Sequence, residues 1–184
     1  VGSSLFGDGA AAVVMVGDEG VSSRTCLLKT VDARGFVFYS NRGSRKARAL
    51  AHDPRVALVF GWYAVHRQVG VRGVAQEVPR PETETYFRSR PYSSRIGAWA
   101  SRQSTTIASA AALDAQFAEL SRRWPDTGSP QDVPVPDHWG GFLVRPTEVE
   151  FWQGRTSRLH DRLVFVGAGA LDDATAWRTE RRQP

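Results

Sequence analysis

The stretch from Val56 to Val78, VALVFGWYAVHRQVGVRGVAQEV, decides the fold class. Residues 56–63 and 67–78 are rich in β-branched and aromatic side chains, and apolar and polar residues alternate strongly in the second segment. This composition and alternation predict two strands joined by a short connection. Strands so close together in sequence favour a meander or a barrel over a parallel sheet.

Further strands are predicted on both sides of this stretch, each short and most of them bounded by turn-forming residues. They comprise residues 10–16, 22–31, 36–41, 142–152, 163–166 and 176–182. Helices are predicted within residues 43–54, 81–91 and 108–124. In the first of these, Ser44 is a typical N-cap and Pro54 a typical stop. The sequence therefore predicts a mainly β protein with helices (α+β), built as a barrel.

The length of 184 residues predicts one domain, residues 1–184, with a loop rich in Pro, Gly and Asp at residues 126–136. The helix expected at residues 108–124 repeats apolar side chains at helical spacing. We expect this stripe to be buried; it consists of Leu113, Phe117, Leu120 and Trp124.

The net charge of +5 points to an acidic partner. Arginines predominate and are scattered over many segments, whereas a nucleic-acid reader concentrates its cations on one helix or stripe. Scattered arginines suit convergence on one compact anion such as a phosphate, because the guanidinium fork binds phosphate bidentately. A generally basic surface explains the same composition equally well. We expect no nucleic-acid partner.

Other functional classes are disfavoured by what the sequence lacks. The single Cys26 excludes an internal disulfide and a cysteine-cluster metal site, and the four histidines are too far apart for ligand spacing. No metal is expected. No apolar run reaches the length of a membrane span, and no signal peptide is visible, so we expect a cytoplasmic protein without a membrane partner.

Arg45 and Lys46 fall in the first turn of their helix, where the macrodipole already presents positive charge. An anion bound to the helix N-terminus would explain them, although both side chains pointing into water would explain them too. Arg24 and Lys29 lie on one expected strand, where strict alternation puts them on opposite faces, so a shared ligand requires a bulge or an edge position. Gln68, and Gln103 within residues 102–107, could each form a hydrogen bond to a ring carbonyl or amide, or could equally face solvent.

Residues 150–162, EFWQGRTSRLHDR, gather aromatic side chains, three arginines and a histidine on an expected strand and turn. A solvated charge run needs no aromatic residues, and a packed core does not tolerate unpaired arginines. The combination indicates a surface that binds a flat, anionic molecule.

These segments together resemble the pyridoxine (pyridoxamine) 5′-phosphate oxidases, flavin enzymes with an FMN-binding split β-barrel. The matching stretches occur in order from about residue 10 to the end of the chain. They are SSRTCLLK, GFVFYSNRGSRKARAL, PRVALVFGWY, RQVGVRGVAQEV, YFRSRP, IGAWAS with the following Gln and Ser, VPVPDHWGGF and EFWQGRTSRLHDRL.

The resemblance implies an FMN cofactor and a homodimer with FMN at the subunit interface. The residues that it implies for FMN are Arg24, Lys29, Tyr39, Ser40, Arg45, Lys46, Gln68, Gln103, Ser104, Trp152 and Arg162. For the substrate phosphate it implies Lys29, Tyr86, Arg90 and Ser94, with Arg158 and His160 over the pyridine ring as catalytic residues.

The reaction implied is the oxidation of pyridoxamine 5′-phosphate or pyridoxine 5′-phosphate to pyridoxal 5′-phosphate. Hydride passes from the 4′ carbon to the flavin, and oxygen then accepts the electrons to form hydrogen peroxide. The flavin carries the redox chemistry, so the protein mainly orients the donor carbon and balances charge.

The chain departs from the family pattern at residues 1–9, which are unlike the segment that usually precedes the first strand, and at Gly61, where a proline is common. Two alternatives keep the fold. One is a flavin oxidase for another ring, such as a phenazine precursor, and the other is a non-catalytic barrel that binds flavin or pyridoxal phosphate.

Overall fold

The computed structural model describes residues 10–17 and 20–184, so the atypical stretch at residues 1–9 lies outside the described residues. Contacts between Cα atoms divide the chain into two compact units. The first unit comprises the described residues up to Phe38 together with Ala49–Gln76 and Phe142–Pro184, and the second comprises Tyr39–Arg48 and Glu77–Gly141.

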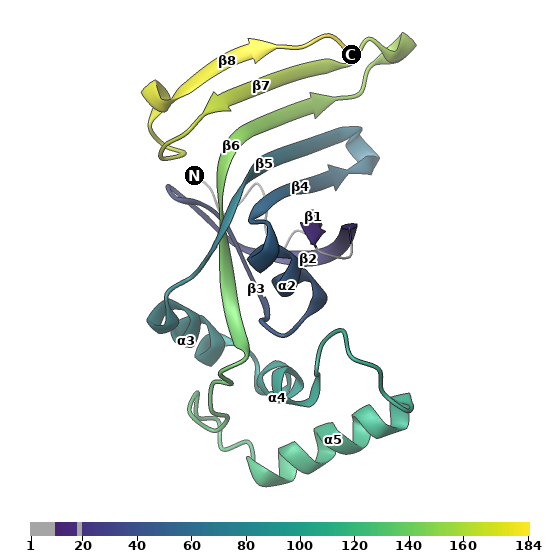
Figure 1. Cartoon of the computed structure of the whole chain (residues 1–184), viewed down its shortest axis with the longest axis vertical. Coiled ribbons are helices and arrows are strands. Elements are labelled where there is room, and N and C mark those ends of the chain that lie inside the picture. The colour runs from purple at the N-terminus through teal and green to yellow at the C-terminus, as the bar shows by residue number, and fades with distance from the viewer. Residues whose placement is uncertain (1–9, 18–19) are drawn as a thin grey trace. The chain divides into compact units, whose positions relative to one another are not determined.

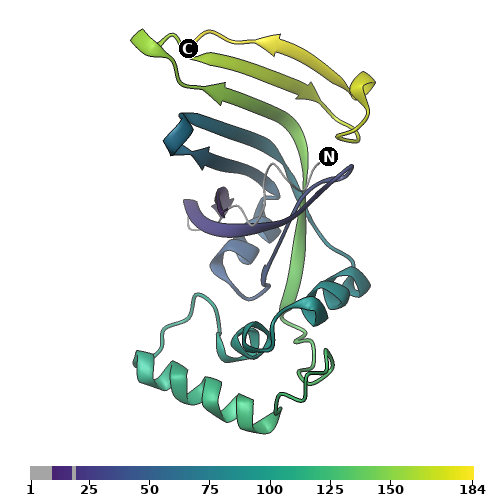
Figure 2. The same cartoon turned by 180° about the vertical axis from the view of Figure 1, so that it is seen from behind.

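The strands form one eight-stranded sheet in the order β3-β2-β1-β4-β5-β6-β7-β8, and an additional pairing joins β3 to β6. That pairing closes β1 to β6 into a six-stranded barrel, and β7 and β8 continue beyond the ring beside β6 (Figures 1 and 2). The strands are β1 (Ala10–Gly17), β2 (Gly20–Asp32), β3 (Gly35–Asn41), β4 (Arg55–Trp62), β5 (Arg67–Glu77), β6 (Trp139–Gln153), β7 (Asp161–Gly167) and β8 (Trp177–Arg181). The barrel class and the positions of its strands are as the sequence predicts.

Side-chain alternation builds the barrel core. In β5, Val69, Val71, Gly73 and Ala75 are buried while the residues between them are not, which is the period-two pattern expected of a half-buried strand. Aromatic rings from different strands meet inside: Phe38 stacks on Phe142 with centroids 5.5 Å apart. The strongly alternating stretch that predicts the fold therefore lines one wall of the core.

The helices are α2 (Arg45–His52), α3 (Arg80–Ser89), α4 (Tyr92–Ala100) and α5 (Ala110–Arg123), with short 3-10 turns at Tyr63–Val65, Thr156–Arg158 and Ala174–Ala176. Ser44 caps α2, because its Oγ accepts the Ala47 N–H at 3.4 Å. The sequence patterns do not predict α4, because Pro91 at its N-cap also marks the end of the preceding helix. None of the helices in the described part of the chain is long and apolar enough to cross a membrane.

The apolar stripe of α5 is less buried than the sequence predicts. No residue of α5 is fully buried, and Leu113 is exposed. Phe117, Leu120 and Trp124 are partly buried against a core cluster of the second unit, which consists of Phe87, Ile96, Val133 and Trp139. Helical periodicity identifies the inner face of a helix but not how much protein covers it.

Two glycines of β5 make a matched pair for testing how closely the strands of the barrel approach. A Cβ at Gly73 would overlap the Arg145 carbonyl oxygen of β6, whereas a Cβ at Gly70 would meet only the Glu150 Cβ, at 4.0 Å. Gly73→Ala is expected to destabilise the protein by roughly 1–3 kcal/mol, because the overlap forces the backbones apart. Gly70→Ala is the control. Urea unfolding of both variants measures the difference, and equal stabilities would contradict the expectation.

Candidate functional site

A cluster of polar groups surrounds the N-terminus of α2 in the second unit. The Lys46 side chain is buried, and its Nζ donates to Ser40 Oγ at 2.8 Å and to Gln103 Oε1 at 2.6 Å. The Ser40 hydroxyl also donates to Gln103 Oε1, at 3.0 Å. Two segments that are distant in sequence, residues 40–46 and the loop of Gln103, therefore converge, and all three of these residues are among those expected to bind FMN.

The expected Arg45 and Ser104 adjoin the same helix end. The backbone N–H of Arg45 donates to Ser104 Oγ at 3.1 Å, and Ser104 has a left-handed backbone with φ 72°. The helix N-terminus therefore differs from the sequence-based expectation in one respect: a side-chain hydroxyl already accepts the N–H of Arg45. The cluster still combines two cations with two hydroxyl groups.

Stacked aromatic rings form a second feature of this unit. Tyr39 stacks on both Tyr86 and Trp139, with centroid separations of 4.1 Å and 5.2 Å, and the rings of Tyr86 and Trp139 are 6.1 Å apart. The Arg90 guanidinium lies over the Trp139 ring, 4.8 Å from its centroid. Ser94 is half-buried in the first turn of α4. The expected substrate residues Tyr86 and Arg90 therefore lie at one aromatic cluster, which also contains Trp139.

Arg90 has an unusual environment for a cation. Its Nη1 is buried and has no hydrogen-bond partner, and burial lowers the pKa of the guanidinium from its ordinary value. A buried donor without an acceptor costs roughly 1–3 kcal/mol, more when the group is charged. The contact with Trp139 offsets part of this cost. An anion that accepted a hydrogen bond from Nη1 would remove the cost of this buried, unpartnered donor.

The turn between β6 and β7, in the first unit, carries the expected catalytic residues. Trp152 is directly opposite Arg162 in the antiparallel register, and its ring is 4.7 Å from the ring of His160. His160 Nδ1 accepts the Arg155 N–H at 3.2 Å, so the neutral imidazole carries its proton on Nε2. Arg158 is exposed and has a left-handed backbone with φ 60°, a strained conformation for a side-chain-bearing residue.

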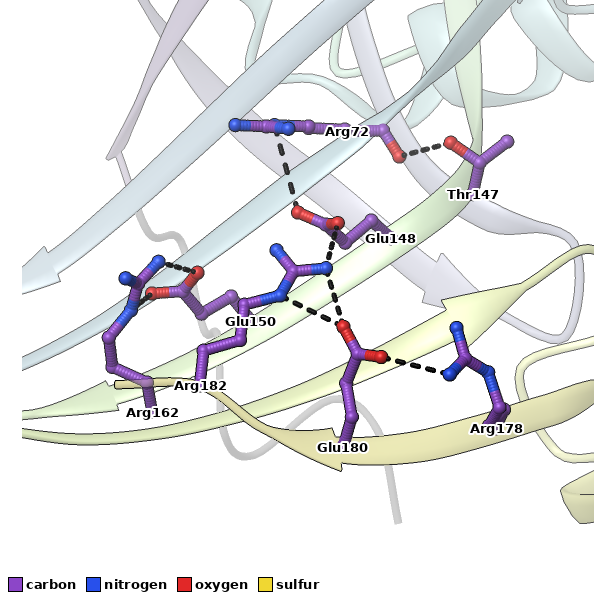
Figure 3. A network of polar contacts seen from close by, with 8 residues as sticks. All are labelled: Arg72, Thr147, Glu148, Glu150, Arg162, Arg178, Glu180 and Arg182. Atoms are coloured by element: carbon purple, nitrogen blue, oxygen red, sulfur yellow. Dashed lines mark hydrogen bonds and ion pairs between the residues drawn. The ribbon is translucent and has the colours of Figure 1, made fainter. Parts of the chain in front are cut away.

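Arg162 is held by two acceptors of the same unit. Its Nε and Nη2 donate to the two carboxylate oxygens of Glu150 at 2.9 Å and 2.7 Å, and its Nη1 donates to the Gln183 carbonyl at 3.1 Å. Figure 3 shows this bidentate pair. The hydrogen bonds to Glu150 raise the pKa of Arg162.

Strand β2 contains a bulge, one of the features that would allow Arg24 and Lys29 to share a ligand. The register with β3 shifts between Leu28 and Thr30, so Lys29 is the extra residue and strict alternation no longer assigns it to the face opposite Arg24. Arg24 itself is exposed and donates to the Ser23 carbonyl at 2.8 Å. Gln68 is half-buried in β5.

Comparisons with known proteins identify the family. Residues 8–123 match the family model described as pyridoxamine 5′-phosphate oxidase, and residues 139–184 match the pyridoxine 5′-phosphate oxidase C-terminal dimerisation region. The chain belongs to the pyridoxamine 5′-phosphate oxidase family. It is therefore an FMN-dependent oxidoreductase, as the resemblance implied, and the match to the dimerisation region confirms the expected homodimer.

Relatives named pyridoxine/pyridoxamine 5′-phosphate oxidase align over most of the chain. The protein from Kineococcus radiotolerans is 68% identical over 178 residues, which cover 95% of this chain and 80% of the relative. The protein from Streptomyces avermitilis is 52% identical over 89% of this chain and 70% of its own length.

Solved structures agree with the barrel assignment. PhzG from Burkholderia lata, in complex with tetrahydrophenazine-1-carboxylic acid, superposes with a TM-score of 0.83 at 28% identity. It covers 96% of this chain and 83% of its own. An FMN-binding protein from Nostoc punctiforme, at 15% identity and a TM-score of 0.73 over 98% of this chain and 91% of its own, shares the fold.

The chemistry of the α2 cluster fits the phosphate end of the family's cofactor. Cationic, hydroxyl and amide groups meet there at a helix N-terminus, which is the donor set that a phosphate monoester requires. The sequence patterns do not single out Trp139 or Glu150, because residues 150–162 stand out through their arginines and aromatic side chains, and Trp139 lies outside that stretch. The one available signal was the position of Glu150 two residues before Trp152, on the same face of a strand.

A network of ion pairs lies on the same face of β6 (Figure 3). Glu148 accepts from Arg182 Nη2 at 2.8 Å, and Arg72 Nε lies 3.7 Å from its other carboxylate oxygen. Arg182 also donates to Glu180, from Nε at 2.9 Å. The hydrogen bond from Arg182 is the main reason that the pKa of Glu148 is lowered. The network ties the C-terminal segment to β6.

Glu148→Gln tests this network through its pH dependence. Because the folded pKa of Glu148 lies below its ordinary value of 4.5, the pair stabilises the fold above that value, and the stabilisation is lost as the pH falls through the folded pKa. At about pH 7 the variant is expected to be less stable by roughly 1 kcal/mol. Thermal unfolding from about pH 7 to pH 3 should show the two curves converging. A pH-independent difference would contradict the expectation.

Proposed function

We propose that the protein oxidises pyridoxamine 5′-phosphate and pyridoxine 5′-phosphate to pyridoxal 5′-phosphate, with O₂ reduced to H₂O₂. The observation that carries the proposal is the buried, unpartnered Nη1 of Arg90 beside the Tyr39–Tyr86 stack. A flat ring that bears a phosphate suits this combination, because the rings offer a stacking surface and the guanidinium donates hydrogen bonds to an anionic partner. The names of the relatives at 52% and 68% identity support the same substrates.

For the cofactor, we propose that Arg45, Lys46, Ser40 and Ser104 hold the FMN phosphate and the adjoining ribityl chain. Their shared position at the start of α2 supports this role, since the helix dipole favours negative charge at that end. The other FMN residues proposed are Arg24, Lys29, Tyr39, Gln68, Gln103, Trp152 and Arg162, and FMN is proposed to lie at the interface of the homodimer.

For the substrate, we propose that Arg90, Tyr86, Ser94 and Lys29 bind the phosphate group, and that Arg158 and His160 face the pyridine ring. His160 has its Nδ1 engaged by the Arg155 N–H, so Nε2–H is the group left to donate to a ring substituent. Arg158 belongs to a backbone held in a strained conformation, which restricts the directions in which its side chain leaves the turn.

When bound, FMN would supply the redox chemistry of the proposed reaction, as the acceptor of a hydride from the 4′ carbon of the substrate and the donor of those electrons to O₂, with H₂O₂ as the product. An alcohol would yield the aldehyde directly with loss of its hydroxyl proton, and an amine would yield an imine that water hydrolyses to the same aldehyde and ammonia. The chain contributes orientation and charge. Its proposed phosphate residues fix one end of the substrate, so that the 4′ carbon is presented in one geometry.

The first experiment is anaerobic mixing of the FMN-loaded protein with pyridoxine 5′-phosphate. We expect the flavin absorbance to bleach and pyridoxal 5′-phosphate to appear, with H₂O₂ formed when air is admitted. The structural similarity to PhzG makes a non-phosphorylated ring the second candidate substrate. A flavin that stays oxidised with the vitamin phosphates but bleaches with a reduced phenazine carboxylate would favour that alternative. Bleaching with neither would favour a flavin-binding role without this oxidase activity.

Arg90→Gln is expected to raise the KM for pyridoxine 5′-phosphate roughly tenfold to a hundredfold, because a charge-assisted bond to the phosphate is lost. Oxidation of unphosphorylated pyridoxine should change little. Arg88→Gln is the matched control, since Arg88 is exposed and pairs with Glu84 at 3.0 Å. Equal KM values for the two variants would remove Arg90 from the proposed phosphate site.

We also propose that the protein works in the cytoplasm, on the pathway that makes the coenzyme pyridoxal phosphate. The lone Cys26 suits a reducing compartment, because it has no second cysteine in the chain with which to form a disulfide. The substrates and product of the proposed reaction are phosphorylated, and such molecules do not cross membranes readily.

A further inference from the structure

We propose that Glu150 is a positioning residue of the flavin site, which holds the Arg162 guanidinium in place before the cofactor binds. The inference rests on the proposed function, in that it takes Arg162 to be a flavin residue. It adds a residue that touches neither flavin nor substrate and acts only through Arg162.

Strand geometry places the pair at the proposed site. Glu150 and Trp152 are two residues apart in β6, so their side chains leave the same face, and Trp152 is directly opposite Arg162 of β7. The guanidinium therefore reaches diagonally across the strands to Glu150 (Figure 3). The same diagonal leaves Arg162 beside the Trp152 side chain, the other flavin residue proposed on this hairpin.

The contacts of Arg162 fix its orientation as well as its position. Its fork meets both carboxylate oxygens of Glu150, and its remaining nitrogen donates to the Gln183 carbonyl. A guanidinium held at all three nitrogens has one orientation. The Glu150 side chain is only 16% exposed, compared with 30% for Arg162, so solvent weakens this pair less than an open surface pair.

Holding an arginine in advance has a direct consequence for binding. A long side chain that is immobilised only when a ligand arrives costs about 0.5–1.5 kcal/mol in lost rotamer freedom. In this protein the ordering is completed during folding, and the carboxylate also balances the charge of Arg162. The arginine can then direct a hydrogen bond to the flavin without a rearrangement.

Glu148 provides a matched control, because it resembles Glu150 in all but its partner. Both glutamates lie on the same face of β6, both side chains are 16% exposed, and both accept from an arginine, at 2.8 Å for Glu148 and 2.7 Å for Glu150. The partner of Glu148 is Arg182, which is not among the proposed flavin residues. If FMN affinity fell merely because a mostly buried carboxylate had been removed, it would therefore fall equally in Glu150→Gln and Glu148→Gln.

The test is a titration of the apoprotein with FMN, followed by flavin fluorescence. Glu150→Gln is expected to weaken FMN binding by about tenfold, the loss of one charge-assisted hydrogen bond, while Glu148→Gln changes it by less than about twofold. Glu150→Asp should recover part of the affinity, because its carboxylate retains the charge. Melting temperatures of the apoproteins separate these effects from global stability.

A double-mutant cycle identifies whether Glu150 acts through Arg162. Arg162→Gln should itself weaken FMN binding, and adding Glu150→Gln to it should cause no further loss. A further loss in that background, or equal affinities for Glu150→Gln and Glu148→Gln, would overturn the inference while leaving the proposed function intact. If Arg162→Gln bound FMN normally, the placement of Arg162 in the proposed function would fail, and the role of Glu150 with it. Should Glu150→Gln not fold, Glu150→Asp takes its place in the same cycle.

Discussion

The pairing of β6 with both β3 and β7 is the interaction on which the rest of the structure depends. Its pairing with β3 closes the six-stranded ring, and its antiparallel register with β7 forms the hairpin that carries Trp152, His160 and Arg162. A slip of β7 by one residue in that register would turn Arg162 to the face of the sheet opposite Trp152 and Glu150. Closure of the barrel and the hairpin that carries these proposed site residues therefore depend on the same strand.

Much of the fold follows from local patterns in the sequence. The alternation of residues 67–78 predicts β5, and the Ser44 cap predicts the start of α2, because both patterns act over a few residues. The depth at which α5 packs and the existence of α4 were not predictable in this way. Both depend on segments far away in the sequence, such as Val133 and Trp139, which complete the core cluster around them.

The same distinction between local and long-range information applies to the candidate site. The residue types were available from the sequence, and the family match confirms the flavoenzyme class to which they pointed. The residues with which they pair or form hydrogen bonds could not be predicted from the sequence. The bulge at Lys29 depends on the register with β3, the bond between Arg45 and Ser104 joins residues far apart in the chain, and Glu150 meets Arg162 only because β6 and β7 pair in one register. Local spacing contains no information on these pairings.

Arg162 and Arg90 have opposite environments in the proposed site. The difference matches the charge of the ligand group that each is proposed to bind. Arg162 is paired with a carboxylate, so its net charge is balanced and it suits a largely neutral flavin ring. Arg90 is desolvated with Nη1 unpartnered, and its lowered pKa reflects the cost of keeping that charge buried. Binding a doubly charged phosphate relieves this cost, whereas a neutral ligand does not. A substrate without a phosphate would leave the cost in place, so in the proposed role Arg90 would select for the phosphorylated ring through the destabilisation of its own free state.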